Sequence, residues 1–128
     1  MPGELLSVVE LGGYPDFSAL YKRFGYEPTV EYSMRKALHR LKRKSYDVVV
    51  AEFNYQHTFR DRLSSLESLI AAVQKHPNIR LIVFYEKEHA EQFKILESQY
   101  AFYATVRFPI MESKVEAILS ALAKEDAV

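Results

Sequence analysis

The segment that most constrains the fold is Tyr46-Asp47-Val48-Val49-Val50-Ala51-Glu52, near the middle of the chain. Its apolar run is too short for a helix and too apolar for a strand with one face in water. Such a run is typical of a strand buried on both faces, as in the centre of a parallel sheet. The strand ends on a carboxylate, Glu52. Ligands of open α/β sheets collect at the carboxyl ends of the central strands, so Glu52 is a candidate functional residue.

Apolar segments on either side of this strand alternate between strand and helix spacing. Four further strands are predicted, at 5–9, 29–32, 81–85 and 102–106. Apolar residues recur at helical spacing within 17–24, 34–41, 63–73, 90–96 and 111–122. Short helical crossovers make the strands parallel and place helices on both faces of the sheet. The sequence therefore predicts one α/β domain over residues 1–128, with a doubly wound five-stranded parallel sheet.

Composition excludes several classes of function. The 128-residue chain has 17 basic and 17 acidic side chains, so no net charge draws it to nucleic acid or to an anionic membrane. No apolar run reaches the ~18 residues that a membrane span needs. The absence of cysteine excludes disulfides, thiolate catalysis and cysteine-ligated metals. The basic start of a signal peptide is missing, and we expect a cytoplasmic protein.

Three short motifs are similar in order and spacing to those of the receiver domains of two-component response regulators. They are Ala37-Leu38 through Leu41-Lys42, the central strand 46–52, and Phe108-Pro109 before the last helix. Receivers have a helix ending in leucine and lysine, then a tyrosine-aspartate that opens the central strand, and later a lysine-proline. The resemblance covers nearly the whole chain. It implies a flavodoxin-like sheet in the order 2-1-3-4-5 and a role in two-component signal transduction.

The chain departs from the receiver pattern at the chemical positions of the phosphorylation pocket. Glu52 replaces the phosphorylated aspartate, and Glu10 alone remains of two acidic residues after the first strand. Tyr85 or Glu86 falls at the hydroxyl position, and Phe108 replaces the lysine. Glutamate is one methylene longer than aspartate, and phosphoryl transfer depends on positioning. We therefore predict a degenerate receiver, or pseudo-receiver, that is neither phosphorylated nor an enzyme.

Two roles for Glu52 fit this pattern. Its carboxylate mimics the charge of a phosphorylated aspartate, or it is structural and bonds to nearby backbone. Together with Glu10 it would attract a divalent cation weakly, through water. The four histidines lack metal-ligand spacing, and no other metal site is predicted.

The pair Gly12-Gly13 follows the first strand at the switch point of the sheet, which makes it a candidate ligand loop for a phosphate or nucleotide. The more common role of such a pair is only to turn the chain. The spacing is neither that of a dinucleotide fingerprint nor that of a P-loop, and we predict no cofactor.

Several aromatic residues are candidates for an interaction surface: Phe53, Tyr55, Phe59, Tyr100 and Tyr103. The first three lie in the segment 53–62, which we expect to be a long loop beside the pocket. The last two lie close to the face of the fourth helix, fifth strand and fifth helix. Receivers commonly dimerise or bind their outputs through that face, so the resemblance implies a homodimer or a partner there.

Charge is unevenly distributed along the chain. The segment 35–44 is basic around most of a helix, whereas the segment 86–97 carries four glutamates. Such a distribution either steers a partner and favours head-to-tail association, or is a solvated helix face. No reading helix or base-stacking motif accompanies the basic segment, so nucleic acid is not an expected partner.

We expect a cytoplasmic signalling module that binds another signalling protein, either a kinase or an output protein. One alternative is a small-molecule or nucleotide sensor that uses the pocket at the carboxyl ends of strands 1 and 3. A lower alternative is a response regulator that is weakly phosphorylated.

Overall fold

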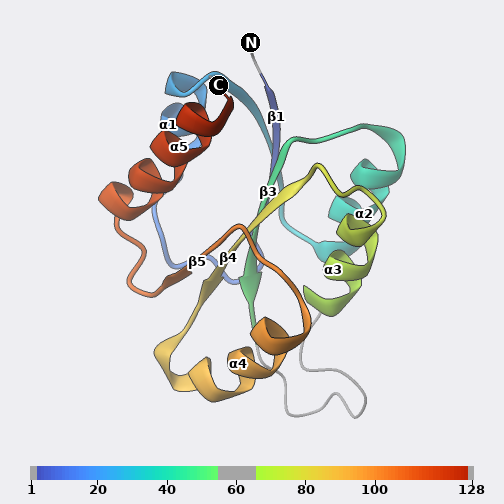
Figure 1. Cartoon of the computed structure of the whole chain (residues 1–128), viewed down its shortest axis with the longest axis vertical. Coiled ribbons are helices and arrows are strands. Elements are labelled where there is room, and N and C mark those ends of the chain that lie inside the picture. The colour runs from blue at the N-terminus through green and yellow to red at the C-terminus, as the bar shows by residue number, and fades with distance from the viewer. Residues whose placement is uncertain (1–2, 55–65, 127–128) are drawn as a thin grey trace.

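The five predicted strands form one parallel sheet in the order β2-β1-β3-β4-β5. They are β1 (Gly3–Val8), β2 (Tyr26–Glu31), β3 (Val48–Phe53), β4 (Arg80–Tyr85) and β5 (Ala104–Arg107). The structure, a computed structural model, describes residues 3–54 and 66–126. The chain reverses direction across the sheet between β2 and β3, so the switch point lies between β1 and β3 (Figure 1). The fold class and the strand order are as predicted.

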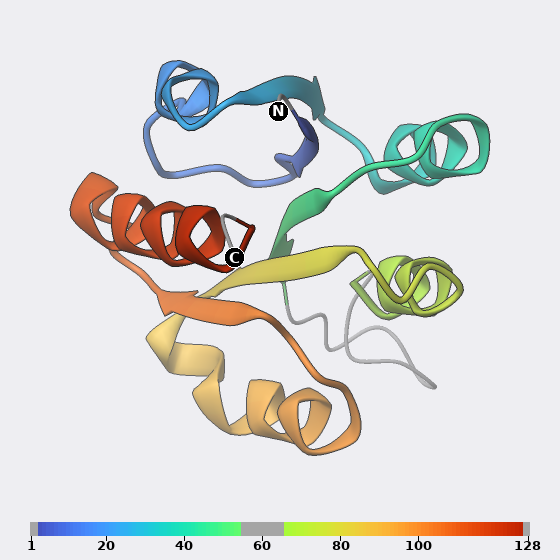
Figure 2. The ribbon, with the colours of Figure 1, turned by 45° about the horizontal axis from the view of Figure 1, so that its top comes forward.

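Helices cover both faces of the sheet (Figure 2). One face carries α1 (Ser18–Arg23) and α5 (Glu112–Asp126). The other carries α2 (Met34–Arg43), α3 (Leu66–Gln74) and α4 (Ala90–Gln99), and a 3-10 turn, η1 (Lys87–His89), precedes α4. Among the described residues, no helix combines the length and apolar composition that crossing a bilayer requires.

The strand β3 separates two apolar clusters. Val48 and Val50 belong to the cluster under α1 and α5, whereas Val49, Ala51 and Phe53 belong to the cluster under α2, α3 and α4. Successive side chains of a strand point to opposite faces, so a central strand needs apolar residues at consecutive positions. This requirement accounts for the valine run of the sequence.

Local sequence signals set the ends of the first two helices. Ser33 caps α2, because its Oγ accepts the amide hydrogen of Lys36 at 3.2 Å. Gly25, with φ of 90°, lies just after the end of α1, where a residue without a Cβ is favoured. The helix α1 begins at Ser18, and the side chain of Asp16 accepts the Ser18 amide at 2.9 Å.

The end of β3 corrects one prediction. Phe53, expected in a loop and on an interaction surface, is the last residue of β3 and is 1% exposed. Its ring lies 5.1 Å from that of Phe93 in α4. The sheet continues one residue past Glu52, and the alternation of the strand directs Phe53 into the core. Tyr55 and Phe59 lie outside the described residues.

Candidate functional site

The carboxylate of Glu52 lies buried at the carboxyl edge of the sheet, with 1% of the residue exposed. The connection after β1 folds over it. The backbone amides of Glu10, Leu11 and Gly12 donate hydrogen bonds of 2.9–3.3 Å to its two oxygens. Successive amides that converge in this way form an anion-binding concavity. Here the anion is a side chain of the same protein.

The glycine pair gives this connection its shape. Gly12 and Gly13 have φ of 73° and 88°, values that side chains with a Cβ rarely adopt. At these angles the chain turns back, and the amide of Gly12 faces Glu52. The proposal that the pair holds a ligand stays a prediction. The amide of Gly12, however, already has an acceptor within the chain.

Two side chains complete the bonds to Glu52. The hydroxyl of Tyr14 donates to Oε2 at 2.5 Å, and Nδ2 of Asn54 donates to Oε1 at 3.3 Å. Burial raises the pKa of Tyr14 far above its ordinary value, and the hydrogen bond to Glu52 and the charge of Glu52 raise it further. The hydroxyl therefore keeps its proton and remains a donor at neutral pH.

The ring of Tyr14 forms one wall of the site with three phenylalanines. It lies edge-on to Phe84 at 5.0 Å, parallel to Phe17 at 6.1 Å, and tilted against Phe108 at 5.9 Å between ring centroids. Phe108 stands where the resemblance places the lysine of a receiver. It supplies an apolar contact there in place of a positive charge, so this wall offers no cation to a phosphate.

Tyr85, predicted in the same pocket, packs elsewhere. It is the last residue of β4, and its ring stacks on Phe93 at 4.6 Å, in the cluster under α2, α3 and α4. Its neighbour Phe84 pairs with Glu52 across the strands and packs on Tyr14. Adjacent positions of β4 therefore face opposite sides, and Phe84 is the residue of this strand that lines the site.

Glu10 contributes to the site through its backbone amide, which donates to Glu52 at 3.2 Å. A cation between Glu10 and Glu52, as predicted from the sequence, would compete with the N–H and O–H donors on both Glu52 oxygens. Within residues 3–54 and 66–126, no group of three His, Asp or Glu side chains is placed to hold a metal ion.

The two predicted surface tyrosines near β5 are half-buried. Tyr100 directly follows α4 and packs against the cluster beneath it. Tyr103 donates its hydroxyl hydrogen to Glu125 of α5, and the guanidinium of Arg80 lies 5.9 Å from its ring. The hydrogen bond to Glu125, with burial and the charge of Glu125, raises the pKa of Tyr103 to about 12. Both rings keep some exposed surface for a contact.

Comparison with solved structures identifies the fold. A response regulator receiver domain protein from Clostridium thermocellum has a TM-score of 0.73 and 16% identity, over 98% of this chain and 97% of that one. The chain has the receiver fold. A CheY-like receiver domain protein from Methanospirillum hungatei JF-1 has a TM-score of 0.71 and 13% identity, over 98% and 96% of the two chains.

A response regulator receiver protein from Sinorhizobium medicae WSM419 shares the receiver fold with a TM-score of 0.70 and 17% identity, over 96% of this chain and 95% of that one. No protein-family model matches the sequence, and no curated protein matches it. At these identities the comparisons establish the receiver fold, and the site has to be interpreted from its own residues.

Sequence reasoning placed Glu52 at the end of the central strand of the receiver fold, and the structure has it there. It missed Tyr14 and Asn54 as partners of Glu52. A signal for Tyr14 was present, because the turn at Gly12-Gly13 sends the next residue back over the edge of the sheet. An aromatic hydroxyl at that point needs an acceptor, and Glu52 is the carboxylate at the end of the adjacent strand.

Proposed function

We propose that this chain is a cytoplasmic receiver-like signalling module that is not phosphorylated and that acts by binding another protein. The proposal that the chain is not phosphorylated rests on the set of hydrogen-bond donors around Glu52. A carboxylate that attacks phosphorus needs a free oxygen and room for in-line approach. Both oxygens of Glu52 instead accept hydrogen bonds from the β1–α1 connection, and the connection covers them.

The surroundings of Glu52 support the same proposal. A transferred phosphoryl group carries charge that receivers stabilise with cations, whereas here the nearest wall is made of Tyr14, Phe84 and Phe108. An anion placed against these rings would lose hydration without gaining an ion pair. Of the two roles considered for Glu52, the structural one is therefore favoured, with the carboxylate holding the β1–α1 connection in one arrangement.

Exposed apolar side chains support the second part of the proposal. Ile95 on α4 is 48% exposed and Met111, just before α5, is 54% exposed. They belong to or adjoin α4 and α5, and Tyr103, just before β5, also keeps some exposed surface. We propose that the α4–β5–α5 face binds a signalling protein, either a kinase or an output protein, or a second copy of the chain. A module without a phosphorylation switch would then signal through its presence and concentration.

The test of the first part is incubation with acetyl phosphate and magnesium, followed by measurement of the intact mass. We expect no phosphoryl adduct on the natural chain. Glu52→Asp is a stringent comparison, because it restores the receiver residue while Phe108 still replaces the cation, and we expect it to remain unmodified as well. A stoichiometric adduct on the natural chain would overturn the proposal. Thermal stabilisation by a nucleotide would favour the ligand-sensing alternative instead.

A further inference from the structure

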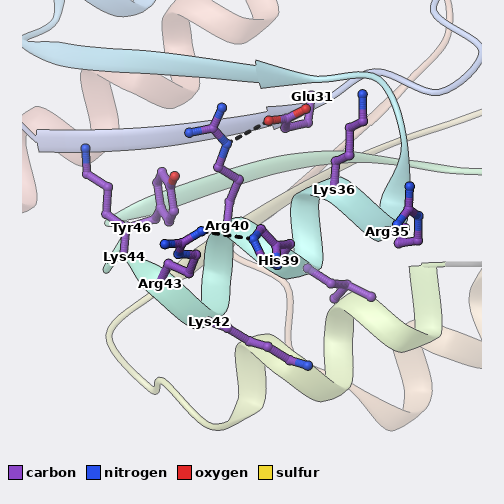
Figure 3. A pocket seen from close by; sticks show the side chains of 10 residues that line it. Glu31, Arg35, Lys36, His39, Arg40, Lys42, Arg43, Lys44 and Tyr46 are labelled. Atoms are coloured by element: carbon purple, nitrogen blue, oxygen red, sulfur yellow. Dashed lines mark hydrogen bonds and ion pairs between the residues drawn. The ribbon is translucent and has the colours of Figure 1, made fainter.

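One strongly basic concave surface is unrelated to the Glu52 site. It has a volume of about 1010 Å³ and lies along α2, where Glu31 at the end of β2 and Tyr46, just before β3, complete it (Figure 3). Six cationic side chains line it: Arg35, Lys36, Arg40, Lys42, Arg43 and Lys44. We refer to this surface as the α2 groove. Figure 3 shows these side chains extending to both sides of the helix.

Most of this positive charge is not compensated. Nε of Arg40 lies 2.7 Å from the carboxylate of Glu31, and Nζ of Lys44 lies 3.0 Å from that of Glu4. In the part of the chain that the structure describes, the other four cations form no ion pair with an acidic residue. Arg43 instead contacts the ring of His39 at 3.3 Å. Two carboxylates therefore face six cations, which is a local excess in a chain of zero net charge.

The α2 groove also contains a buried donor. Tyr46 is 4% exposed, and its hydroxyl has no hydrogen-bond partner among the described residues. Figure 3 shows its ring between the side chains of Arg40 and Lys44. Burial of an unpaired hydroxyl is unfavourable, and an anion that accepts its hydrogen would remove that cost. Arg40 and Lys44 have long, half-exposed side chains that can turn toward such an anion.

We propose that the α2 groove binds a short acidic segment of a partner protein. Arg35, Lys36, Lys42 and Arg43 would pair with its carboxylates, and the hydroxyl of Tyr46 would donate to one of them. This names a partner class for the protein-binding function proposed above and rests on that function. It concerns a surface separate from the α4–β5–α5 face.

The dimensions and surroundings of the groove favour a peptide over a nucleic acid. The ten residues of α2 span ~15 Å, which is the length of four or five extended residues. A nucleic acid needs a longer basic track and gains affinity from exposed rings that stack on its bases. Here Glu31 and Glu4 limit the basic surface, and the ring of Tyr46 is buried.

The test measures fluorescence anisotropy of a labelled peptide rich in glutamate and aspartate, at low ionic strength. We expect the natural chain to bind it, and the double variant Lys36→Glu, Lys42→Glu to bind it at least about tenfold more weakly. The matched control is Lys94→Glu, Lys114→Glu, which makes the same change of charge at two exposed lysines of α4 and α5. We expect the control to bind like the natural chain.

A second variant examines the buried donor alone. Tyr46→Phe removes one hydroxyl that has no partner within the described residues, so we expect an unchanged or raised melting temperature. We expect peptide affinity to fall about fivefold, the value of one ordinary hydrogen bond. Unchanged affinity in Tyr46→Phe would contradict the assigned role of the hydroxyl.

Equal weakening by the groove variant and its control would overturn the inference, since it would show a general charge effect. Tighter binding of a single-stranded oligonucleotide than of the peptide would also overturn it, in favour of nucleic acid. The result is independent of the acetyl phosphate experiment. A phosphoryl adduct refutes the proposed function, whereas lack of peptide binding without an adduct refutes only the acidic partner.

Discussion

The hydroxyl of Tyr14 donates a 2.5 Å hydrogen bond to Oε2 of Glu52, which lies 38 positions further along the chain. This bond joins the connection after β1 to the end of β3, across the switch point of the sheet. The two side chains join segments that are distant in the sequence, so their interaction should first be measured through the stability of the fold.

Replacing Tyr14 by phenylalanine keeps the ring contacts and removes the donor. Hydrogen bonds to charged groups contribute about 1.5–3 kcal/mol, so we expect Tyr14→Phe to lower the free energy of unfolding by about that amount. Chemical denaturation measures the change. Tyr103→Phe is the matched control, since that hydroxyl bonds to Glu125 near the surface and its loss should cost less than about 1 kcal/mol. Equal effects of the two variants would contradict the importance assigned to the buried pair.

Replacing Glu52 by glutamine tests the backbone donors. The change keeps the size of the side chain but replaces one oxygen with an NH₂ group. The backbone amides of Glu10, Leu11 and Gly12 are donors, so they can bond to an oxygen but not to this group. We expect a loss of stability of about 2–3 kcal/mol. Amide hydrogen exchange should show lower protection at Leu11 and Gly12. Unchanged protection there would contradict the proposal that Glu52 holds the connection.

The stability of the protein should fall at high pH. Burial, the bond to Glu52 and its charge raise the pKa of Tyr14 in the folded state, and the pKa of Tyr103 is raised to about 12. A group with a raised pKa in the folded state contributes its stability below the unfolded value, which is 10.0 for tyrosine. Above that pH the unfolded chain releases protons that the folded chain retains, so the free energy of unfolding decreases.

Denaturation curves between about pH 8 and pH 11 measure this decrease. Tyr14→Phe removes one of the contributing groups, and we expect its free energy of unfolding to fall less steeply across this range. A variant that retains the full slope of the natural chain would show that the ionisation of Tyr14 does not contribute.

Association through the α4–β5–α5 face depends on exposed apolar side chains. We expect Ile95→Glu to abolish it, because a charge at a position that is 48% exposed disrupts an apolar contact without disturbing the core. Sedimentation velocity compares the oligomeric state of the natural chain and the variant. Glu97→Lys, on the same helix, is a control that changes charge without removing an apolar side chain. A dimer that persists in Ile95→Glu would place the contact elsewhere.

The fold was predictable because each strand and helix is specified by a pattern of residues close together in the sequence. The valine run identified β3, and apolar residues at helical spacing identified α2 over 34–41 and α1 over 17–24. Each signal lies within a few residues of the structure that it specifies. The crossovers between these elements then determine a parallel sheet.

The site was only partly predictable. The position of Glu52 followed from the strand pattern, but its bonds to Tyr14 and to the amides of Glu10 and Leu11 join segments about forty positions apart. No local period encodes such contacts. Phe53 was misplaced for a related reason, since the end of a strand is set by its partner β4 as much as by its own residues.

The last turn of α5 is attached to the sheet at the edge remote from Glu52. Tyr103 bonds to Glu125, and the guanidinium of Arg80, at the first position of β4, bonds to Asp126 at 2.9 Å. Figure 1 shows this end of α5 at the same end of the sheet as the start of β1. A fluorescent reporter fused after α5 would therefore lie at the edge of the sheet opposite Glu52 and leave the β1–α1 connection unobstructed.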